Sequence, residues 1–142
     1  MQRDEILSME AGRELDALVA ERVMGWGDIS LHPMMDSDWW GMPSGPATAI
    51  QGAVGWLYTH EKVPNYSTDI AAAWEVVEAV RGRGWSLSLG EGMSGYGDAV
   101  VWMVDFYKGN RICLSANGPD VPLAICRAAL LAVMEDDDAR TD

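Results

Sequence analysis

The sequence contains few of the residues that most often carry catalysis or cross-links. Its two cysteines, Cys113 and Cys126, match no metal-binding spacing, and we expect both to be buried thiols in a reducing compartment. Its two histidines, His32 and His60, lie in no Ser-His-Asp or Cys-His arrangement with local support. We therefore expect no enzyme activity, no catalytic residue and no cofactor.

His32 lies near three aspartates in the sequence, which leaves a metal site as an alternative to a solvated acidic loop. Asp28, Asp36 and Asp38 could each supply oxygen ligands, but the spacing matches no established site. An acidic loop of this kind usually faces water. We therefore predict no metal ligands here.

Basic residues and long apolar runs are also scarce. The chain of 142 residues has 10 Lys and Arg against 22 Asp and Glu, a net charge of −12, which opposes broad binding to nucleic acid or anionic membranes. No apolar run approaches the ~20 residues that span a bilayer. The first five residues lack the pattern of a signal peptide. We expect a cytosolic protein with neither nucleic acid nor membrane as a partner.

The clearest structural signal is an amphipathic helix that ends near Arg81. Ser67, Thr68 and Asp69 are good residues for a helix start, and Gly82 suits the position after a helix end. At 100° per residue, one wide arc is apolar and predicts a stripe that faces the core: Ile70, Ala73, Trp74, Val76, Val77 and Val80.

Two further helices are indicated. One covers about residues 4–24, although Gly12 weakens its middle, so that the first turns could form a separate piece. The other covers residues 122–134, follows a capping Asp120, and is apolar on nearly every side. We expect this last helix to be the most buried one.

Alternating apolar residues predict three antiparallel strands at residues 85–89, 96–107 and 112–116, with a turn at 90–95. The second strand is apolar on both faces, so we expect it to be central and covered on both sides. Together these elements predict an α+β fold, in which a small three-stranded antiparallel sheet packs with helices as a helix–sheet–helix sandwich.

The remaining residues predict two irregular segments in a single domain of residues 1–142. Residues 27–63 are rich in Trp, Gly and Pro, and we interpret them as a long loop that either wraps the core or is a functional insertion. Residues 135–142 carry a run of acidic side chains and are expected to be a solvated tail.

Three blocks of the sequence resemble the phage ABA-sandwich domain family. They are LDALVAERVMGW at residues 15–26, YSTDIAAAW at 66–74 and PLAICRAAL at 122–130, in the order that the family has them. The resemblance implies a small protein of phages and prophages with a layered helix–sheet–helix fold, acting in the host cytoplasm. The family has no established enzyme activity, so it implies no catalytic residues.

The phage setting and the inventory of Trp and Arg suggest a binding protein. Small non-enzymatic phage proteins can block host immunity by sequestering nucleotide signals, and such a site needs flat aromatic rings and a few cations. Trp85 beside Arg83 could offer both. We also expect a homo-oligomer. The candidate ligand-binding residues are Arg22, Trp26, Tyr66, Arg81, Arg83, Trp85 and Arg111.

Two alternatives stay open. Arg22 lies within the apolar arc of its helix, where it either reaches out to water or points at a ligand. The whole protein could instead be a phage accessory protein that acts through protein–protein interaction, and mimicry of nucleic acid by its acidic surface is one version of this alternative. A concave basic pocket would favour the signal binder, and an exposed apolar patch would favour the partner binder.

Overall fold

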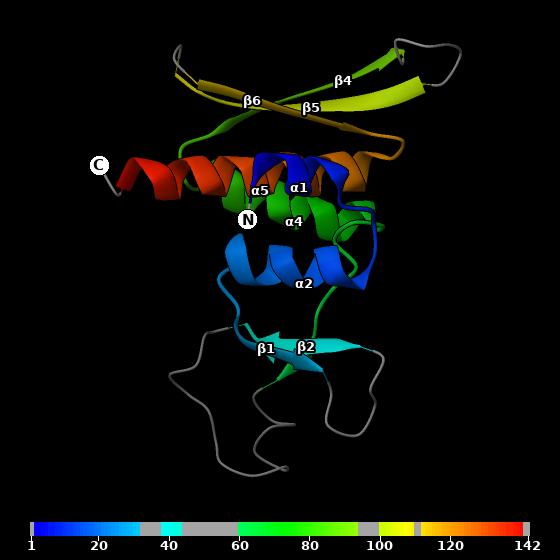
Figure 1. The fold of residues 1–142 in the computed structure, drawn as a ribbon, viewed down its shortest axis with the longest axis vertical. Helices are drawn as coiled ribbons and strands as arrows, with labels where there is room; N and C mark the ends of the chain where they lie inside the picture. The colour runs from blue at the N-terminus through cyan, green and yellow to red at the C-terminus, as the bar shows by residue number, and fades with distance from the viewer. Residues whose placement is uncertain (1, 32–37, 44–59, 94–99, 110–111, 141–142) are drawn as a thin grey trace.

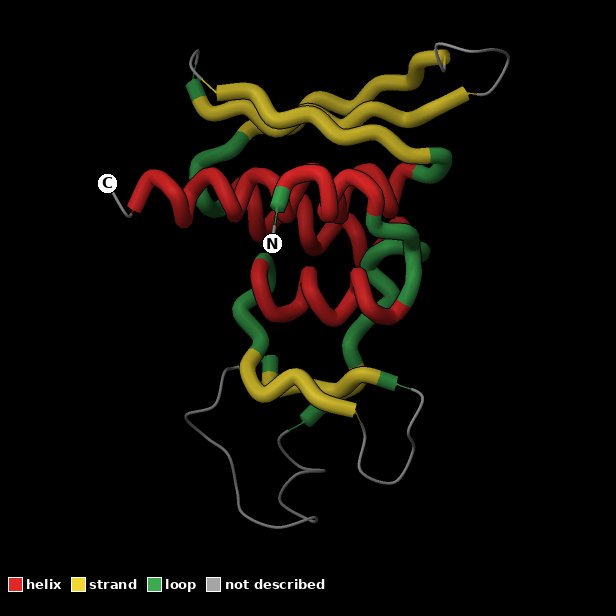
Figure 2. Tube along the Cα trace, in the orientation of Figure 1, coloured by secondary structure: helices red, strands yellow, loops and turns green. Residues whose placement is uncertain are grey.

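Helices lie between two antiparallel sheets in the computed structural model, which describes residues 2–31, 38–43, 60–93, 100–109 and 112–140 (Figures 1 and 2). The strand orders are β1-β2-β3 and β4-β5-β6, and the α+β fold with helices packed on a three-stranded sheet is confirmed. The described elements are α1 (Arg3–Ser8), α2 (Arg13–Arg22), β1 (Gly27–Leu31), β2 (Trp39–Met42), β3 (Glu61–Lys62), α4 (Ile70–Arg81), β4 (Ser86–Met93), β5 (Val100–Lys108), β6 (Ile112–Gly118) and α5 (Val121–Arg140).

Helix α4 forms where the sequence predicts it. The Asp69 side chain accepts a hydrogen bond from the Ala71 backbone N–H at 3.0 Å, which satisfies one free donor of the first turn. The predicted stripe is too wide, because Ile70 and Trp74 are 52% and 44% exposed. The residues of the stripe that are buried are Ala73, Val76, Val77 and Val80.

The helix predicted for residues 4–24 is two helices, α1 and α2, with Gly12 between them. Gly12 has a φ of 153°, a conformation that glycine adopts without steric cost. Its N–H donates to Ser67 Oγ at 2.9 Å, and Asp16 Oδ1 accepts the Ser67 N–H at 2.7 Å. These hydrogen bonds fasten the start of α2 to the residues that precede α4.

Helix α5 runs through the core and is longer than predicted. It continues past Met134 to Arg140, so the segment predicted as an irregular tail is helical over residues 135–140, although Asp137 and Asp138 are exposed to solvent as predicted. Arg127 ties the helix to two other segments: Nη2 donates to the Met9 carbonyl at 2.7 Å and Nη1 donates to the Asn117 carbonyl at 2.8 Å. Arg127 therefore fastens the first half of α5 to β6 and to the residue that follows α1.

The larger sheet joins β4, β5 and β6, with β5 in the centre as predicted. Strand β4 continues beyond residue 89, so the turn predicted at 90–95 is wrong for residues 90–93; residues 94–99 lie outside the described chain. The pairing with β5 explains the difference, since Gly90 lies opposite Met103 and Gly92 opposite Val101. Each glycine leaves room beside a larger side chain on the neighbouring strand.

The helices cover one face of the larger sheet, and on its other face no described helix lies (Figure 1). Val104 and Phe106 point to the helices and are fully buried, whereas Met103 and Tyr107 on the opposite face are 41% and 37% exposed. Cys113 is also exposed. The expectations that β5 is covered on both sides and that Cys113 is buried are therefore wrong.

Cys126 lies in α5 and is buried, as predicted. Its thiol has no exposed surface, and burial raises its pKa above the ordinary range, with a smaller contribution from the charge of Asp16. A thiol in this state is a small apolar core group.

The smaller sheet lies where the sequence predicts a loop, and this part of that prediction is wrong. Strand β2 pairs with β1 and β3, and its Gly41 packs so closely that an added Cβ would meet the side chains of Ile29 and Trp26. His60, which directly precedes β3, has its Nε2 2.7 Å from Oδ2 of Asp28 in β1. This contact links the two edge strands of the sheet. Residues 32–37 and 44–59 lie outside the described chain.

Candidate functional site

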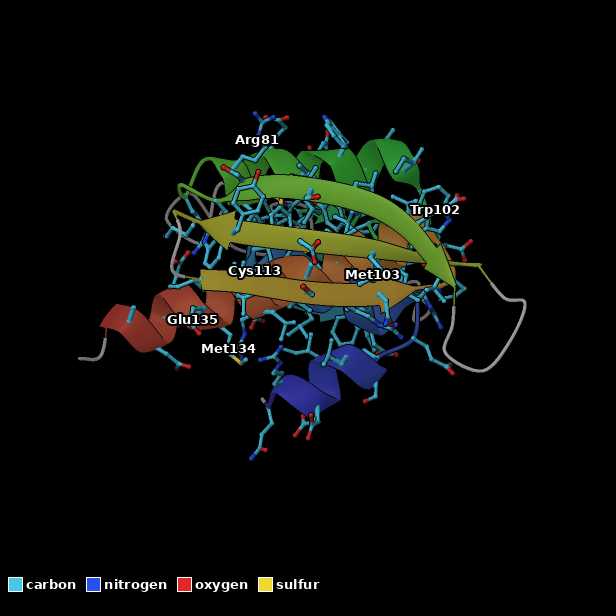
Figure 3. All side chains as sticks on the ribbon, turned by 90° about the horizontal axis from the view of Figure 1, so that it is seen from above. Arg81, Trp102, Met103, Cys113, Met134 and Glu135 are labelled. Carbon is cyan, nitrogen blue, oxygen red and sulfur yellow. The ribbon has the colours of Figure 1, made fainter. Side chains whose placement is uncertain are left out.

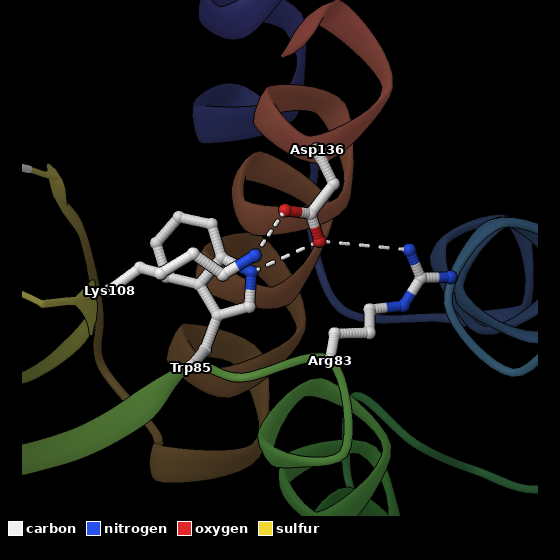
Figure 4. Close-up of polar contacts among 4 residues, drawn as sticks. All are labelled: Arg83, Trp85, Lys108 and Asp136. Carbon is white, nitrogen blue, oxygen red and sulfur yellow. Dashed lines mark hydrogen bonds and ion pairs between the residues drawn. The ribbon is translucent and has the colours of Figure 1, made fainter. Parts of the chain in front are cut away.

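Four polar or charged side chains from three parts of the chain meet at one end of the larger sheet (Figure 4). Arg83 and Trp85 lie in the tight turn between α4 and β4, which Gly84 allows with a φ of 98°. Lys108 is the last residue of β5, and β4 and β5 pair next to it. Asp136 comes from the last turns of α5.

Asp136 is the common partner of the other three. Its Oδ1 accepts a hydrogen bond from Lys108 Nζ at 2.8 Å, and its Oδ2 accepts one from Trp85 Nε1 at 3.1 Å. Arg83 Nη1 lies 3.8 Å from the same Oδ2. Lys108 Nζ also lies 5.0 Å from the centre of the Trp85 ring, within cation–π distance.

These contacts set the charge of the cluster. Burial favours the protonated form of Asp136, but the hydrogen bonds from Lys108 and Trp85 and the charges of Lys108 and Arg83 outweigh it, so the pKa of Asp136 lies below its ordinary value. Asp136 is therefore ionised at neutral pH. Two cations around one carboxylate leave the cluster with one net positive charge, in a chain of net charge −12.

An open hollow of about 470 Å³ lies over this cluster. It is lined by Gly82, Arg83, Lys108, Asp136 and Ala139. The Arg83 and Lys108 side chains are 29% and 37% exposed, so both can contact a bound group while they also contact Asp136. Such a pair of cations suits an anion with several oxygens, because a guanidinium can bind two of them at once. We call this hollow the Arg83 site.

The structure brings two of the seven predicted site residues, Arg83 and Trp85, together at the Arg83 site. The Trp85 ring is only 2% exposed, so it positions Lys108 and Asp136 and offers no open face on which a base could stack. Arg81 is nearby in sequence but points to solvent and pairs with Glu78 at 3.2 Å.

The other predicted site residues lie apart. Arg22 is 52% exposed at the end of α2, pairs with Glu21, and lines a separate hollow of about 220 Å³ beside α5. Tyr66 is fully buried, and burial is the main cause that raises its pKa. Trp26 is half-buried against the core and Gly41, and Arg111 lies outside the described residues.

A second open hollow, of about 520 Å³, lies where α4 and α5 begin. Trp102 and Ile70 line it together with Ser67, Thr68 and Asp120. It has the partly exposed aromatic ring that the Arg83 site lacks. Its lining includes no described cation, however, and the carboxylate of Asp120 lies at the start of α5, where it opposes a bound anion.

A comparison with protein families agrees with this architecture. The model of the phage ABA sandwich domain matches residues 17–130, a span that contains both sheets, α4 and the first half of α5. The chain belongs to the phage ABA sandwich domain family. No curated protein and no solved structure matches it.

The described part of this phage ABA sandwich protein shows neither a metal-binding cluster nor a membrane-spanning helix. Within the described residues, no group of three or more His, Cys, Asp or Glu side chains could hold a metal ion. His32 and Asp36, from the alternative metal site, lie outside those residues, while Asp28 contacts His60. None of the described helices is both long and apolar enough to cross a membrane.

Two residues of the Arg83 site, Lys108 and Asp136, were not predicted from the sequence. Lys108 follows a strand and precedes a turn, and such a lysine is indistinguishable in sequence from a solvated one. Asp136 belongs to the acidic run of residues 135–138, in which Asp137 and Asp138 are exposed. The available signal was its helical spacing, since residues 129, 132, 133 and 136 fall on one face of a helix that continues α5.

Proposed function

We propose that this phage protein is non-enzymatic and binds a small nucleotide-type host immune signal in the host cytoplasm, thereby sequestering it. The observation that carries the proposal is the Arg83 site, a hollow with two partly exposed cations in a strongly acidic protein. The phosphate groups of the ligand contact Arg83 and Lys108. The family's phage setting supports the role in defence.

The chemistry of the Arg83 site supports binding of a phosphate group. The Arg83 guanidinium donates from a planar fork, and Lys108 adds a compact charge that Asp136 and the Trp85 ring hold in place. Asp136 prevents the two cations from repelling each other in the empty site. An incoming phosphate competes with this carboxylate for Arg83, whose 3.8 Å contact is the longer of the two ion pairs.

The first experiment identifies the ligand without assuming it. The purified protein is incubated with extracts of infected cells that carry a nucleotide-based defence system, then washed and heated, and the released small molecules are measured by mass spectrometry. We expect an enriched cyclic nucleotide or ADP-ribose derivative. Folded protein that releases no enriched nucleotide across several defence systems would contradict the proposal.

Matched variants locate the binding. Arg83→Ala and Lys108→Ala are expected to reduce the released nucleotide at least tenfold, because each removes one of the two cations that contact phosphate. Arg3→Ala removes the same charge from an exposed position on α1 and serves as the control. Equal losses in all three variants would show that only the overall charge matters and would reject the Arg83 site.

A second candidate function has an observation of its own. The open face of the larger sheet carries the exposed Met103 and Tyr107, which suits a phage accessory protein that binds another protein. In this alternative a host or phage protein is captured by the wild-type chain and lost in Met103→Lys, whereas Arg83→Ala keeps it. Competition of the captured protein by DNA would indicate the version in which acidic residues mimic nucleic acid.

A further inference from the structure

The open hollow of about 520 Å³ at the start of α4 and α5 differs in chemistry from the Arg83 site. It combines a half-buried aromatic ring, Trp102, with an exposed carboxylate, Asp120. The rest of its lining consists of two hydroxyl residues and three apolar ones: Ser67, Thr68, Ile70, Val121 and Pro122. An aromatic ring beside a carboxylate attracts organic cations. We call this hollow the Trp102 hollow.

The Trp102 hollow and the Arg83 site lie at opposite ends of α4. The helix begins at Ile70, which lines the hollow, and ends at Arg81, two residues before Arg83. Between these two ends α4 rises by about 17 Å. In the view onto the larger sheet, Trp102 and Arg81 accordingly lie at opposite ends (Figure 3). The hollow is therefore a separate site.

Strand pairing fixes the Trp102 ring beside the start of α5. On one side Trp102 pairs with Gly118 in β6, where an added Cβ would lie 3.4 Å from the Ala124 backbone nitrogen and from the Leu123 side chain. The first turn of α5 thus packs directly on β6 next to Trp102. The link from Gly118 to α5 consists of residues 119 and 120 alone, so it holds Asp120 close to the ring.

A second carboxylate lies on the other side of the ring. Glu91 in β4 is the direct partner of Trp102 in the strand pairing, so the two side chains project from the same face of the sheet. The Cβ atoms of such partners are about 4.5–5.5 Å apart. Glu91 and Asp120 are both exposed, and neither forms an ion pair with another described residue. Both can therefore contact a bound cation.

The two helix starts at the hollow oppose a cation, but the carboxylates outweigh them. Each helix start carries about half a positive charge. Asp69 offsets the start of α4 by accepting the Ala71 N–H at 3.0 Å, and Asp120 directly precedes α5. Together with Glu91, these carboxylates bring three negative charges against roughly one positive charge. Because the described lining contains no Lys or Arg, the hollow favours a cation.

We propose that the Trp102 hollow binds an aliphatic polyamine, a chain of methylene groups that carries two or more ammonium ions. One ammonium ion lies over the Trp102 ring and contacts Asp120, since indole is the most favourable ring for a cation–π contact. The methylene chain packs against Ile70 and Val121, and a second ammonium ion contacts Glu91. Two carboxylates on either side of an apolar ring suit two charges joined by an apolar chain better than one compact ion.

Isothermal titration calorimetry with spermidine tests the site in the full chain. We expect wild type to bind spermidine at one site, and Trp102→Leu and Asp120→Asn each to weaken binding about tenfold. Asparagine is as good as aspartate before a helix, so Asp120→Asn should keep the fold. Asp137→Asn removes the same charge from an exposed position on α5 and is the matched control. Equal weakening by both Asp variants would show that only the overall charge of −12 matters.

Nuclear magnetic resonance locates the bound spermidine independently of affinity. The indole N–H signal of Trp102, assigned by its loss in Trp102→Phe, should shift when spermidine is added. The indole N–H signal of Trp85, which donates to Asp136 at the other end of α4, should stay in place. Trp102→Phe also keeps an aromatic ring in the sheet if Trp102→Leu fails to fold. A shift at Trp85 without one at Trp102 would overturn the inference.

Three further titrations separate a polyamine from other ligands. Magnesium chloride at the same concentration should not displace spermidine, because a compact hydrated ion gains nothing from the ring. A lysine blocked at both ends has a single ammonium ion and should bind at least tenfold more weakly than spermidine; equal affinity would reject a polyamine as the ligand. Inorganic phosphate should not bind. Phosphate binding that Asp120→Asn strengthens would show that the helix starts dominate and would overturn the inference.

The test is independent of the proposed function. Arg83→Ala should lose the nucleotide and still bind spermidine, whereas Asp120→Asn should show the reverse. Folded wild-type protein that does not bind spermidine would reject the polyamine site and leave the Arg83 site in place.

Discussion

Asp16 and Asp136 are two carboxylates withdrawn from water, and their surroundings shift the pKa in opposite directions. Asp16 is 3% exposed, and burial raises its pKa although hydrogen bonds from Ser67 oppose the shift. The Asp136 side chain is 13% exposed, and Lys108, Trp85 and Arg83 together lower its pKa against the effect of burial. The number of donors and cations therefore decides the sign more than the depth of burial does.

The difference separates a structural role from a functional one. Asp16 accepts a backbone hydrogen bond, joins α2 to the residues that precede α4, and does not line the Arg83 site. Asp136 gathers two cations at the surface and leaves both partly exposed. We expect substitution of the first to change mainly folding, and substitution of the second to change both stability and the charge available to a ligand.

The largest effect on stability should come from Asp16→Ala. The Ser67 N–H would lose its acceptor in a buried joint, at a cost of about 2–3 kcal/mol in the free energy of unfolding. Chemical denaturation measures this loss. Asp16→Asn keeps an oxygen in the same place and removes the buried charge, so it should lose less than half as much. A similar loss in both variants would show that the charge of Asp16 is itself stabilising.

A smaller loss, about 1–2 kcal/mol, is expected for Asp136→Ala. The variant leaves the Trp85 N–H and the Lys108 ammonium without their shared acceptor, but water can reach the site and replace part of the contact. Asp137→Ala changes an exposed neighbour in the same helix and should stay within ~0.5 kcal/mol of wild type. An equal loss in the two variants would mean that Asp136 acts only through general charge.

The pH dependence of stability should reverse between the two aspartates. Because the folded-state pKa of Asp136 is lowered, its contribution is present above about pH 4 and is lost as the pH falls through that lowered pKa. Because the pKa of Asp16 is raised, its ionisation costs stability, and this cost disappears as the pH falls below the raised value.

Urea denaturation at a series of pH values separates the two effects. Asp136→Asn should be less stable than wild type at neutral pH, with a difference that shrinks in acid. Asp16→Asn should show its most favourable difference from wild type at neutral pH and lose it in acid. Parallel curves for wild type and Asp136→Asn would contradict the lowered pKa.

The sequence predicted those parts of the fold in which a local pattern and the tertiary structure agree. Helix α4 begins at the capping Asp69 and ends near Gly82, and β5 is central, because capping and alternation act over a few residues. The smaller sheet was missed because its strands are short and rich in Trp and Gly, and only their pairing with each other makes them strands.

Exposure was less predictable than secondary structure. The apolar arc of α4 includes Ile70 and Trp74, but no described element covers that side of the helix, so the pattern overstates burial. At the Arg83 site, the sequence placed Arg83 beside Trp85 and could not place Lys108 or Asp136, which are 23 and 51 residues from Trp85. Long-range contacts of that kind arise from packing and have no local signature.

Among the substitutions at Asp16, Asp136 and Arg83, the smallest effect on stability should come from Arg83→Ala. Arg83 contributes a partly exposed ion pair at 3.8 Å, and pairs of this kind are worth at most about 1 kcal/mol. Asp136 keeps its hydrogen bonds from Lys108 and Trp85, so the cluster stays folded. The same variant removes the one guanidinium that lines the Arg83 site among the described residues and should reduce nucleotide binding strongly. Thermal unfolding and ligand titration on one preparation compare the two. A large loss of stability with unchanged binding would assign Arg83 to the fold, together with Asp16.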